Sequence, residues 1–220
     1  MQSATFPELR RQHPPDTNHR IERCELRITL GDDPKRARYA CHLTIRVTGG
    51  QSETEWETVV PSLPPHVQFE GARDASGGLQ HTFIPEGTST RIPIRYRHEL
   101  TSNSPPYEFS YGYETSIKAV VTPSMHGQVV HYTDWFMPDV DCQLMKVAIS
   151  LPKRCRAIQT FPAANLDAEV INFTYEGMRP LEVFQFVVVY HKRKLGREAW
   201  LWIAGVIVSA VVGAVIGNLL

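Results

Sequence analysis

The sequence predicts an all-β fold, an antiparallel β-sandwich of about ten strands, followed by a single C-terminal transmembrane helix. Short segments alternate apolar and polar residues, which is the pattern of half-buried strands. The 16 prolines and 14 glycines separate these segments and argue against long helices. The segment 199–220 contains no charged residue and is long enough to cross a membrane.

These features divide the chain into four parts. Residues 1–20 are polar and contain three prolines, so we expect a flexible N-terminal arm. Residues 21–191 are expected to form a cytoplasmic β-sandwich domain. A basic juxtamembrane linker over 192–198 then leads into the transmembrane helix at 199–220, which serves as a tail anchor.

The first two expected strands, 21–30 and 38–47, show the two-residue period most clearly. Every second side chain is apolar or a cysteine, and the intervening ones are mostly polar or charged. The residues expected to face the core are Cys24, Leu26, Ile28, Leu30, Tyr39, Cys41, Leu43, Ile45 and Val47. Both cysteines are expected to be buried thiols, as is usual in a reducing cytosol.

Further strands are expected at intervals of ~10–15 residues, separated by proline and glycine turns. The expected segments are 55–60, 66–70, 79–84, 90–99, 107–121, 128–136, 143–151, 157–161, 169–175 and 181–191. The stretch 183–190 is the most apolar of them, which predicts a central strand. No sustained 3.6-residue periodicity occurs before residue 199, so a sandwich or barrel is favoured.

The C-terminal segment has the length and composition of a membrane span. As a helix, residues 199–220 extend ~33 Å at ~1.5 Å per residue, against a hydrocarbon core of ~30 Å. Nearby positive charge lies entirely on the N-terminal side, which predicts that this side is cytoplasmic. Trp200 and Trp202 fit the aromatic belt at that boundary. The first residues contain no apolar signal-peptide core, so a single-pass tail anchor is expected.

Small residues recur every fourth position along the expected helix. Gly205, Ser209, Gly213 and Gly217 form one stripe, and the last two make a GxxxG motif. Such a stripe lets two helix backbones approach closely, so we expect a homo-oligomer formed through the helix within the lipid bilayer. The pattern resembles the glycine zipper of some membrane-perforating helices.

The charge balance excludes a strongly basic nucleic-acid binder, because 23 Lys and Arg face 23 Asp and Glu. Arginines nevertheless recur on the expected outer strand faces. These candidate anion-binding residues are Arg23, Arg27, Arg38, Arg46, Arg91, Arg95 and Arg97. Guanidinium groups suit phosphate and carboxylate, so an anionic small molecule such as a nucleotide messenger or a lipid headgroup is one expected partner. The alternative is a solvated face balanced by nearby glutamates.

No catalytic or metal motif is present. The sequence contains no His-Glu-x-x-His, no Gly-x-Ser-x-Gly, no P-loop and no Cys-x-x-Cys, so no catalytic residue, metal site or cofactor is assigned. One polar stretch, with His131, Asp134, Asp139 and Asp141, offers the residue types of a hydrolase site. The alternative for this stretch is a turn stiffened by Pro138.

Three functions follow as hypotheses. In the first, the β-domain senses a ligand or partner, and the self-associating helix makes the protein a membrane-perturbing effector, such as those of bacterial defence or second-messenger systems. In the second, the domain is a passive adaptor that holds a cytosolic protein at a membrane. In the third, the chain is a tail-anchored hydrolase. An enzyme is the less favoured class, because no catalytic motif supports it.

Overall fold

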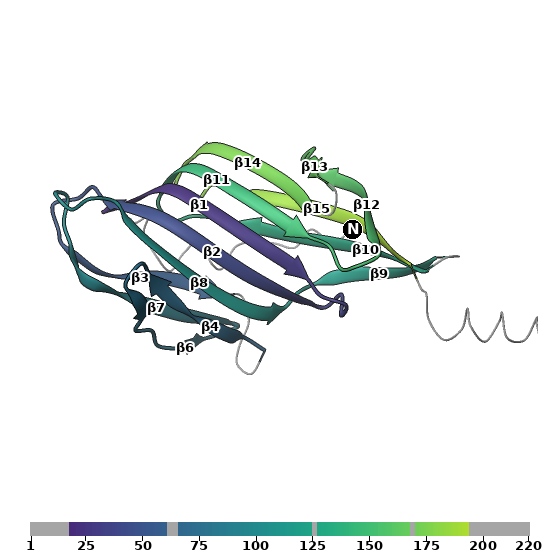
Figure 1. The fold of residues 1–220 in the computed structure, drawn as a ribbon, viewed down its shortest axis with the longest axis horizontal. Coiled ribbons are helices and arrows are strands. Elements are labelled where there is room, and N and C mark those ends of the chain that lie inside the picture. Colours follow the sequence, from purple (N-terminus) through teal and green to yellow (C-terminus); the bar gives the residue numbers. More distant parts are fainter. Residues whose placement is uncertain (1–17, 61–65, 125–126, 168–169, 194–220) are drawn as a thin grey trace, which may run out of the picture.

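The computed structural model describes residues 18–60, 66–124, 127–167 and 170–193, and these residues form an all-β fold of three sheets (Figure 1). The expected transmembrane helix, its small-residue stripe and most of the arm and linker lie outside these residues. Among the described residues, no helix has the length and apolar character of a membrane span. The first strand already starts at His19, within the expected arm.

The largest sheet has eight strands in the order β13-β14-β11-β1-β2-β8-β4-β5. Its strands are β1 (His19–Leu30), β2 (Arg36–Val47), β4 (Gln68–Asp74), β5 (Gly77–Leu79), β8 (Tyr107–Ser116), β11 (Asp141–Ser150), β13 (Asn165–Asp167) and β14 (Val170–Met178). We call it the large sheet.

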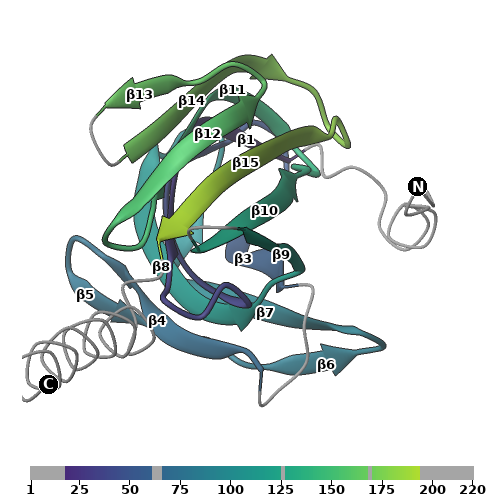
Figure 2. The same cartoon turned by 90° about the vertical axis from the view of Figure 1, so that its right-hand side faces the viewer.

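Two smaller sheets complete the fold. One has the order β12-β15-β10-β9 and is called the β15 sheet; its strands are β9 (Ala119–Ser124), β10 (Gly127–Phe136), β12 (Cys155–Phe161) and β15 (Phe184–Arg193). The other has the order β3-β7-β6, with β3 (Glu53–Val60), β6 (Ile84–Glu86) and β7 (Ser89–Leu100). Figure 2 shows β10 and β15 in front of the large sheet.

The core lies between the large sheet and the two smaller ones. The β15 sheet covers the large sheet where Phe186 meets Phe173, with ring centroids 5.6 Å apart. The three-stranded sheet covers it where Trp56 meets Phe109 at 6.1 Å. Burying such side chains removes ~150–250 Å² of aromatic surface each from water, so these contacts hold the layers together.

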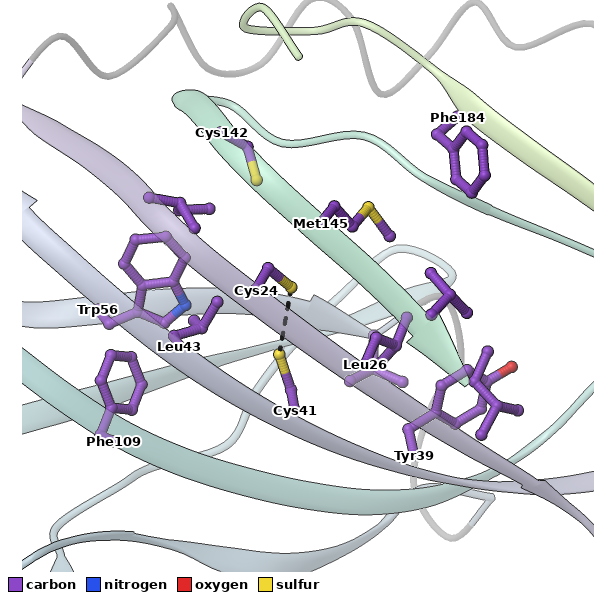
Figure 3. Packing of buried hydrophobic residues seen from close by; sticks show 14 of the residues in the cluster. Cys24, Leu26, Tyr39, Cys41, Leu43, Trp56, Phe109, Cys142, Met145 and Phe184 are labelled. Carbon is purple, nitrogen blue, oxygen red and sulfur yellow. Dashed lines mark hydrogen bonds between the residues drawn. The ribbon is translucent and has the colours of Figure 1, made fainter. Parts of the chain in front are cut away.

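The nine residues predicted to face the core from the first two strands are all buried. Figure 3 shows the part of this cluster around Cys24 and Cys41, whose sulfur atoms lie 3.9 Å apart as free thiols. The most apolar segment, β15, has a neighbour on each side within its sheet, so the expectation of an internal strand is confirmed.

The expectation of a wholly antiparallel sandwich of about ten strands was wrong in two respects. First, β1 and β11 pair in parallel, with Ile28 opposite Ile149. Parallel neighbours need a long connection, and here β2 to β10 supply it. Second, the described residues contain fifteen strands.

The extra strands arise where one alternating stretch serves two sheets. The expected strand 107–121 divides into β8 and β9, because the chain leaves the large sheet after Ser116 and joins the β15 sheet at Ala119. The expected strand 79–84 was also wrong: β5 ends at Leu79 and β6 begins at Ile84. The backbone between them makes a single bridge, His81 to Ile94.

Candidate functional site

Exposed cations gather at one end of the sandwich, the end at which β15 finishes. Lys35 lies in the turn after β1, Lys118 between β8 and β9, and Lys153 and Arg154 between β11 and β12. Arg156 follows at the start of β12. All five are exposed, and we call this surface the basic end.

Strand pairing and backbone hydrogen bonds bring these turns together. Ile117 donates its amide to the carbonyl of Lys35 at 2.7 Å. Cys155 lies opposite Lys192, and the Lys192 ammonium donates to the carbonyl of Asp32. Figure 1 shows β9, β15 and the turn between β1 and β2 reaching the same side of the molecule.

The local sequence explains the shapes of these turns. The Asp33 carboxylate accepts the backbone amide of Lys35 at 2.9 Å, and its carbonyl accepts the amide of Arg36 at 3.1 Å. In the turn before β12, Cys155 donates its amide to Pro152 at 3.1 Å, and Arg154 has a φ of 66°. Both turns therefore hold their basic residues at the strand ends, where Lys35, Lys153 and Arg154 are exposed.

The acidic groups of this end do not balance its cations. Asp32 and Asp33 are its exposed carboxylates in the turn between β1 and β2, and Asp167 of β13 lies at the same end, opposite Val170. Arg36 is already paired, since its Nε lies 2.7 Å from a Glu114 carboxylate oxygen. The surface that remains is positive and is built from separate turns, so no single sequence motif predicted it. The signal available was that each turn follows or precedes a strand that ends at this side.

The predicted arginine patch divides between two sheets. Arg23, Arg27, Arg38 and Arg46 lie on the outer side of β1 and β2, which are neighbours as expected. Arg91, Arg95 and Arg97 lie on β7 in the three-stranded sheet, so the seven residues do not form one patch.

Most of these arginines contact carboxylates of the same chain. Arg23 pairs with Glu25, and Arg38 with Glu70. Arg46 contacts Glu22 at 2.6 Å, Arg91 contacts Glu57 and Glu86 at 3.2 and 3.1 Å, and Arg97 holds Asp74 through two bonds of 3.0 Å. Arg27 stands between Ala40 and Ala148, and Arg95 opposite Glu55. The anion-binding role stays a prediction, and a bound anion would have to displace several of these carboxylates.

These ion pairs change the acidity of the carboxylates. The hydrogen bond from Arg46 is the main cause that lowers the pKa of Glu22. Arg97 and then Tyr107, which donates to Asp74 at 2.7 Å, hold the pKa of Asp74 well below its usual range. Burial and the Asp74 carboxylate raise the pKa of Tyr107 to about 12. The carboxylates are therefore ionised partners at neutral pH.

The residues of the hydrolase hypothesis are not brought together on β10. His131 is exposed on the outer side of the strand, whereas Asp134 lies on the inner side with buried Tyr132. Alternate residues of a strand face opposite sides, which separates the two groups. In the described part of the chain, no three His, Cys, Asp or Glu side chains are grouped to hold a metal ion. The geometry gives this hypothesis no support.

Asp134 instead joins the large sheet to the β15 sheet. Its Oδ2 accepts the hydroxyls of Tyr39, on β2, and Tyr132, on β10, at 2.6 Å each. The two hydroxyls lie 3.0 Å apart, and Oδ1 accepts the amide of Trp135 at 2.8 Å. Burial raises the pKa of Asp134, and the tyrosine bonds oppose that shift. Sequence reasoning missed this role, because a single acid in a strand does not reveal what lies across the core.

Comparison with known proteins gives a likeness of fold alone. No protein-family model matches the chain, and no curated protein matches it in sequence. Native leukotriene A4 hydrolase from Saccharomyces cerevisiae is similar in structure, with a TM-score of 0.53 and 10% identity over 86% of this chain and 32% of the hydrolase. An M1 zinc metallopeptidase from Deinococcus radiodurans has a TM-score of 0.47 and 7% identity over 80% and 42% of the two chains. The chain thus spans about a third of the yeast hydrolase.

Proposed function

We propose that the chain is a tail-anchored membrane protein whose β-sandwich lies on the cytoplasmic face of a bilayer with its basic end against anionic headgroups. The observation that carries this proposal is the position of β15. The strand ends among the basic turns, and an uncharged segment of membrane-spanning length begins six residues later.

The short connection supports a close approach to the lipid. Six residues span at most ~20 Å even when fully extended. The basic residues at 192–197 add further positive charge within this connection. Charges near an anionic surface contribute ~1 kcal/mol each and act within a Debye length of ~8 Å. The basic end is therefore the part of the domain best suited to contact headgroups.

The experiment uses the full chain in nanodiscs of pure phosphatidylcholine and in nanodiscs that also contain phosphatidylserine. Hydrogen–deuterium exchange of the turns carrying Lys35, Lys118 and Lys153 should slow when the anionic lipid is present. Replacing these three lysines by glutamate should abolish the difference. The matched control replaces Arg73, Arg95 and Arg179, exposed arginines away from this end, by glutamate and should keep the difference.

Two results would refute parts of the proposal. Loss of the chain from membranes in alkaline carbonate would refute the tail anchor. Equal exchange in both lipids, with the chain still inserted, would refute the headgroup contact while leaving the anchor intact.

For the role at the membrane, we propose a sensor that acts by clustering, because the stripe of small residues favours helix association. Replacing Gly205, Gly213 and Gly217 by leucine in cells should then abolish any toxicity of the expressed chain without preventing insertion. Unchanged toxicity, or none with the native sequence, would favour the passive adaptor.

A further inference from the structure

The outer face of the β15 sheet differs in chemistry from the rest of the strand surface. Among its described outward positions none is a carboxylate, and about half of the side chains are apolar. Val120, Ile158 and Phe161 are 66%, 59% and 67% exposed. The outward-facing apolar residues are Val120, Val129, Trp135, Ile158, Phe161, Val187 and Val189, and we call this surface the β15 face.

The register places these apolar residues beside one another in part and beside uncharged polar residues elsewhere. Val120 lies opposite His131, His131 opposite Val189, and Val189 opposite Gln159, which gives one row across four strands. The next row places Val187 beside Phe161. A bulge at Ile158 adds a further outward apolar side chain on β12. Neighbouring strands lie ~4.8 Å apart, so the rows form one continuous surface.

The outer side of the large sheet provides the contrast within the same molecule. There, ion pairs such as Arg46 with Glu22 and Arg38 with Glu70 cover the strands. That side is built to face water. Large apolar side chains exposed together on one face, as Val120, Ile158 and Phe161 are, mark a candidate interaction site.

We propose that the β15 face packs against the same face of a second copy of this chain. The inference rests on the proposed function, because the occupant is set by the anchor. β15 is an internal strand of this sheet and leads within six residues to the uncharged segment 199–220, which carries the stripe of Gly205, Ser209, Gly213 and Gly217. Helices that pack through such a stripe lie within ~8–10 Å of one another, so their two β15 strands emerge beside each other.

The size of the face explains why the anchor is needed. The four strands have 6, 10, 10 and 7 residues, and at ~3.3 Å per residue and ~4.8 Å per strand they cover about 500 Å² per copy. Stable interfaces bury ~800 Å² per partner, so this face alone is too small for a strong dimer. Tethering through a short linker raises the effective concentration to roughly millimolar, which suffices for a weak interface. In an isologous contact the same surface of both copies meets. Because no described outward position is a carboxylate, such a contact would not bring two negative charges together.

The test is crosslinking of the full chain in liposomes. His131, in the middle of the face, is replaced by cysteine in a chain with Cys155→Ser, since the other cysteines are buried. A short bis-maleimide should give a crosslinked dimer. Adding Val120→Glu and Phe161→Glu should lower its yield about tenfold, because apposed carboxylates lose water and repel one another. The matched control, Thr29→Glu with Thr174→Glu on the outer side of the large sheet, should leave the yield unchanged.

A second reporter separates this inference from the proposed function. Ser209→Cys in the same background reports helix association. If Ser209→Cys crosslinks and His131→Cys does not, the face is not the interface, although the anchor assembles. If neither crosslinks, the clustering part of the proposed function is wrong as well. If the chain is extracted by carbonate, the tail anchor is wrong.

Discussion

Replacing Tyr132 by phenylalanine should weaken the contact between the large sheet and the β15 sheet. The Tyr132 side chain is fully buried, so water does not replace its hydroxyl. The change removes a 2.6 Å hydrogen bond to the Asp134 carboxylate and keeps the ring. Hydrogen bonds to charged groups contribute about 1.5–3 kcal/mol, and Tyr39 still donates its own bond. We therefore expect the free energy of unfolding at pH 7 to fall by about 2–3 kcal/mol.

The loss should depend on pH with a definite sign. Burial raises the pKa of Asp134 above its ordinary 3.8, and the hydroxyl of Tyr132 opposes that shift. Without the hydroxyl, the folded-state pKa rises further, and the native state holds its proton more strongly than the unfolded state. Stability then falls over a wider range of pH above about 3.8. The difference between the variant and the native chain should therefore shrink as pH falls from 7 towards 3.8, because Asp134 takes up a proton and the lost bond becomes a neutral one.

Urea unfolding of the full chain in a non-ionic detergent, followed by tryptophan fluorescence at pH 4 and pH 7, measures both quantities. Tyr190→Phe is the matched control, because Tyr190 is a buried tyrosine of the same sheet and is not part of the Asp134 cluster. Loss of the Tyr190 hydroxyl should lower the free energy of unfolding by less than about 1 kcal/mol at both pH values. An equal loss for the two variants, or a Tyr132→Phe loss that grows as pH falls, would refute the role given to Asp134.

Three further predictions concern the core. Gly112→Ala should lower the free energy of unfolding by about 1–3 kcal/mol in the same urea assay, since a Cβ there would meet the Tyr39 carbonyl oxygen at 3.2 Å. Unchanged stability would show that β2 and β8 can move apart. Of the thiols, Cys155 should react first with a maleimide, and Cys24 should react only on unfolding, as followed by mass spectrometry. Cys155 is partly exposed, whereas Cys24 is fully buried and its pKa is raised by its Cys41 neighbour and by burial. Phe186→Ala should cost about 3–5 kcal/mol in urea unfolding, and a loss below 1 kcal/mol would contradict its place between the layers.

The sequence predicted the parts of the fold that depend on local alternation. The period of two in β1 and β2 identified which residues are buried, because one face of each strand meets the core. It also indicated that β15 is internal, since its long apolar run suits a strand with a neighbour on each side.

Features that depend on distant partners could not be predicted in this way. The parallel pairing of β1 with β11 leaves no local signal, because each strand alternates in the same manner whichever way its neighbour runs. The change of sheet between Ser116 and Ala119 also keeps the alternation. The basic end depends on turns from three parts of the chain, and their proximity follows from the strand order.

The difference between the two outer surfaces, by contrast, can be traced in the sequence once the sheets are known. Strands of the large sheet place arginine and glutamate at alternate outward positions, as in Arg23 with Glu25, whereas β15 places Val187 and Val189 there. Both patterns have the same period, so periodicity alone treats them as equivalent. Valine suits a strand on either kind of surface, so the valines alone do not distinguish the two faces. The distinction depends on the exposed Val120, Ile158 and Phe161 beside them and on the absence of carboxylates among the described outward positions, and these are the observations behind the proposed contact between two copies.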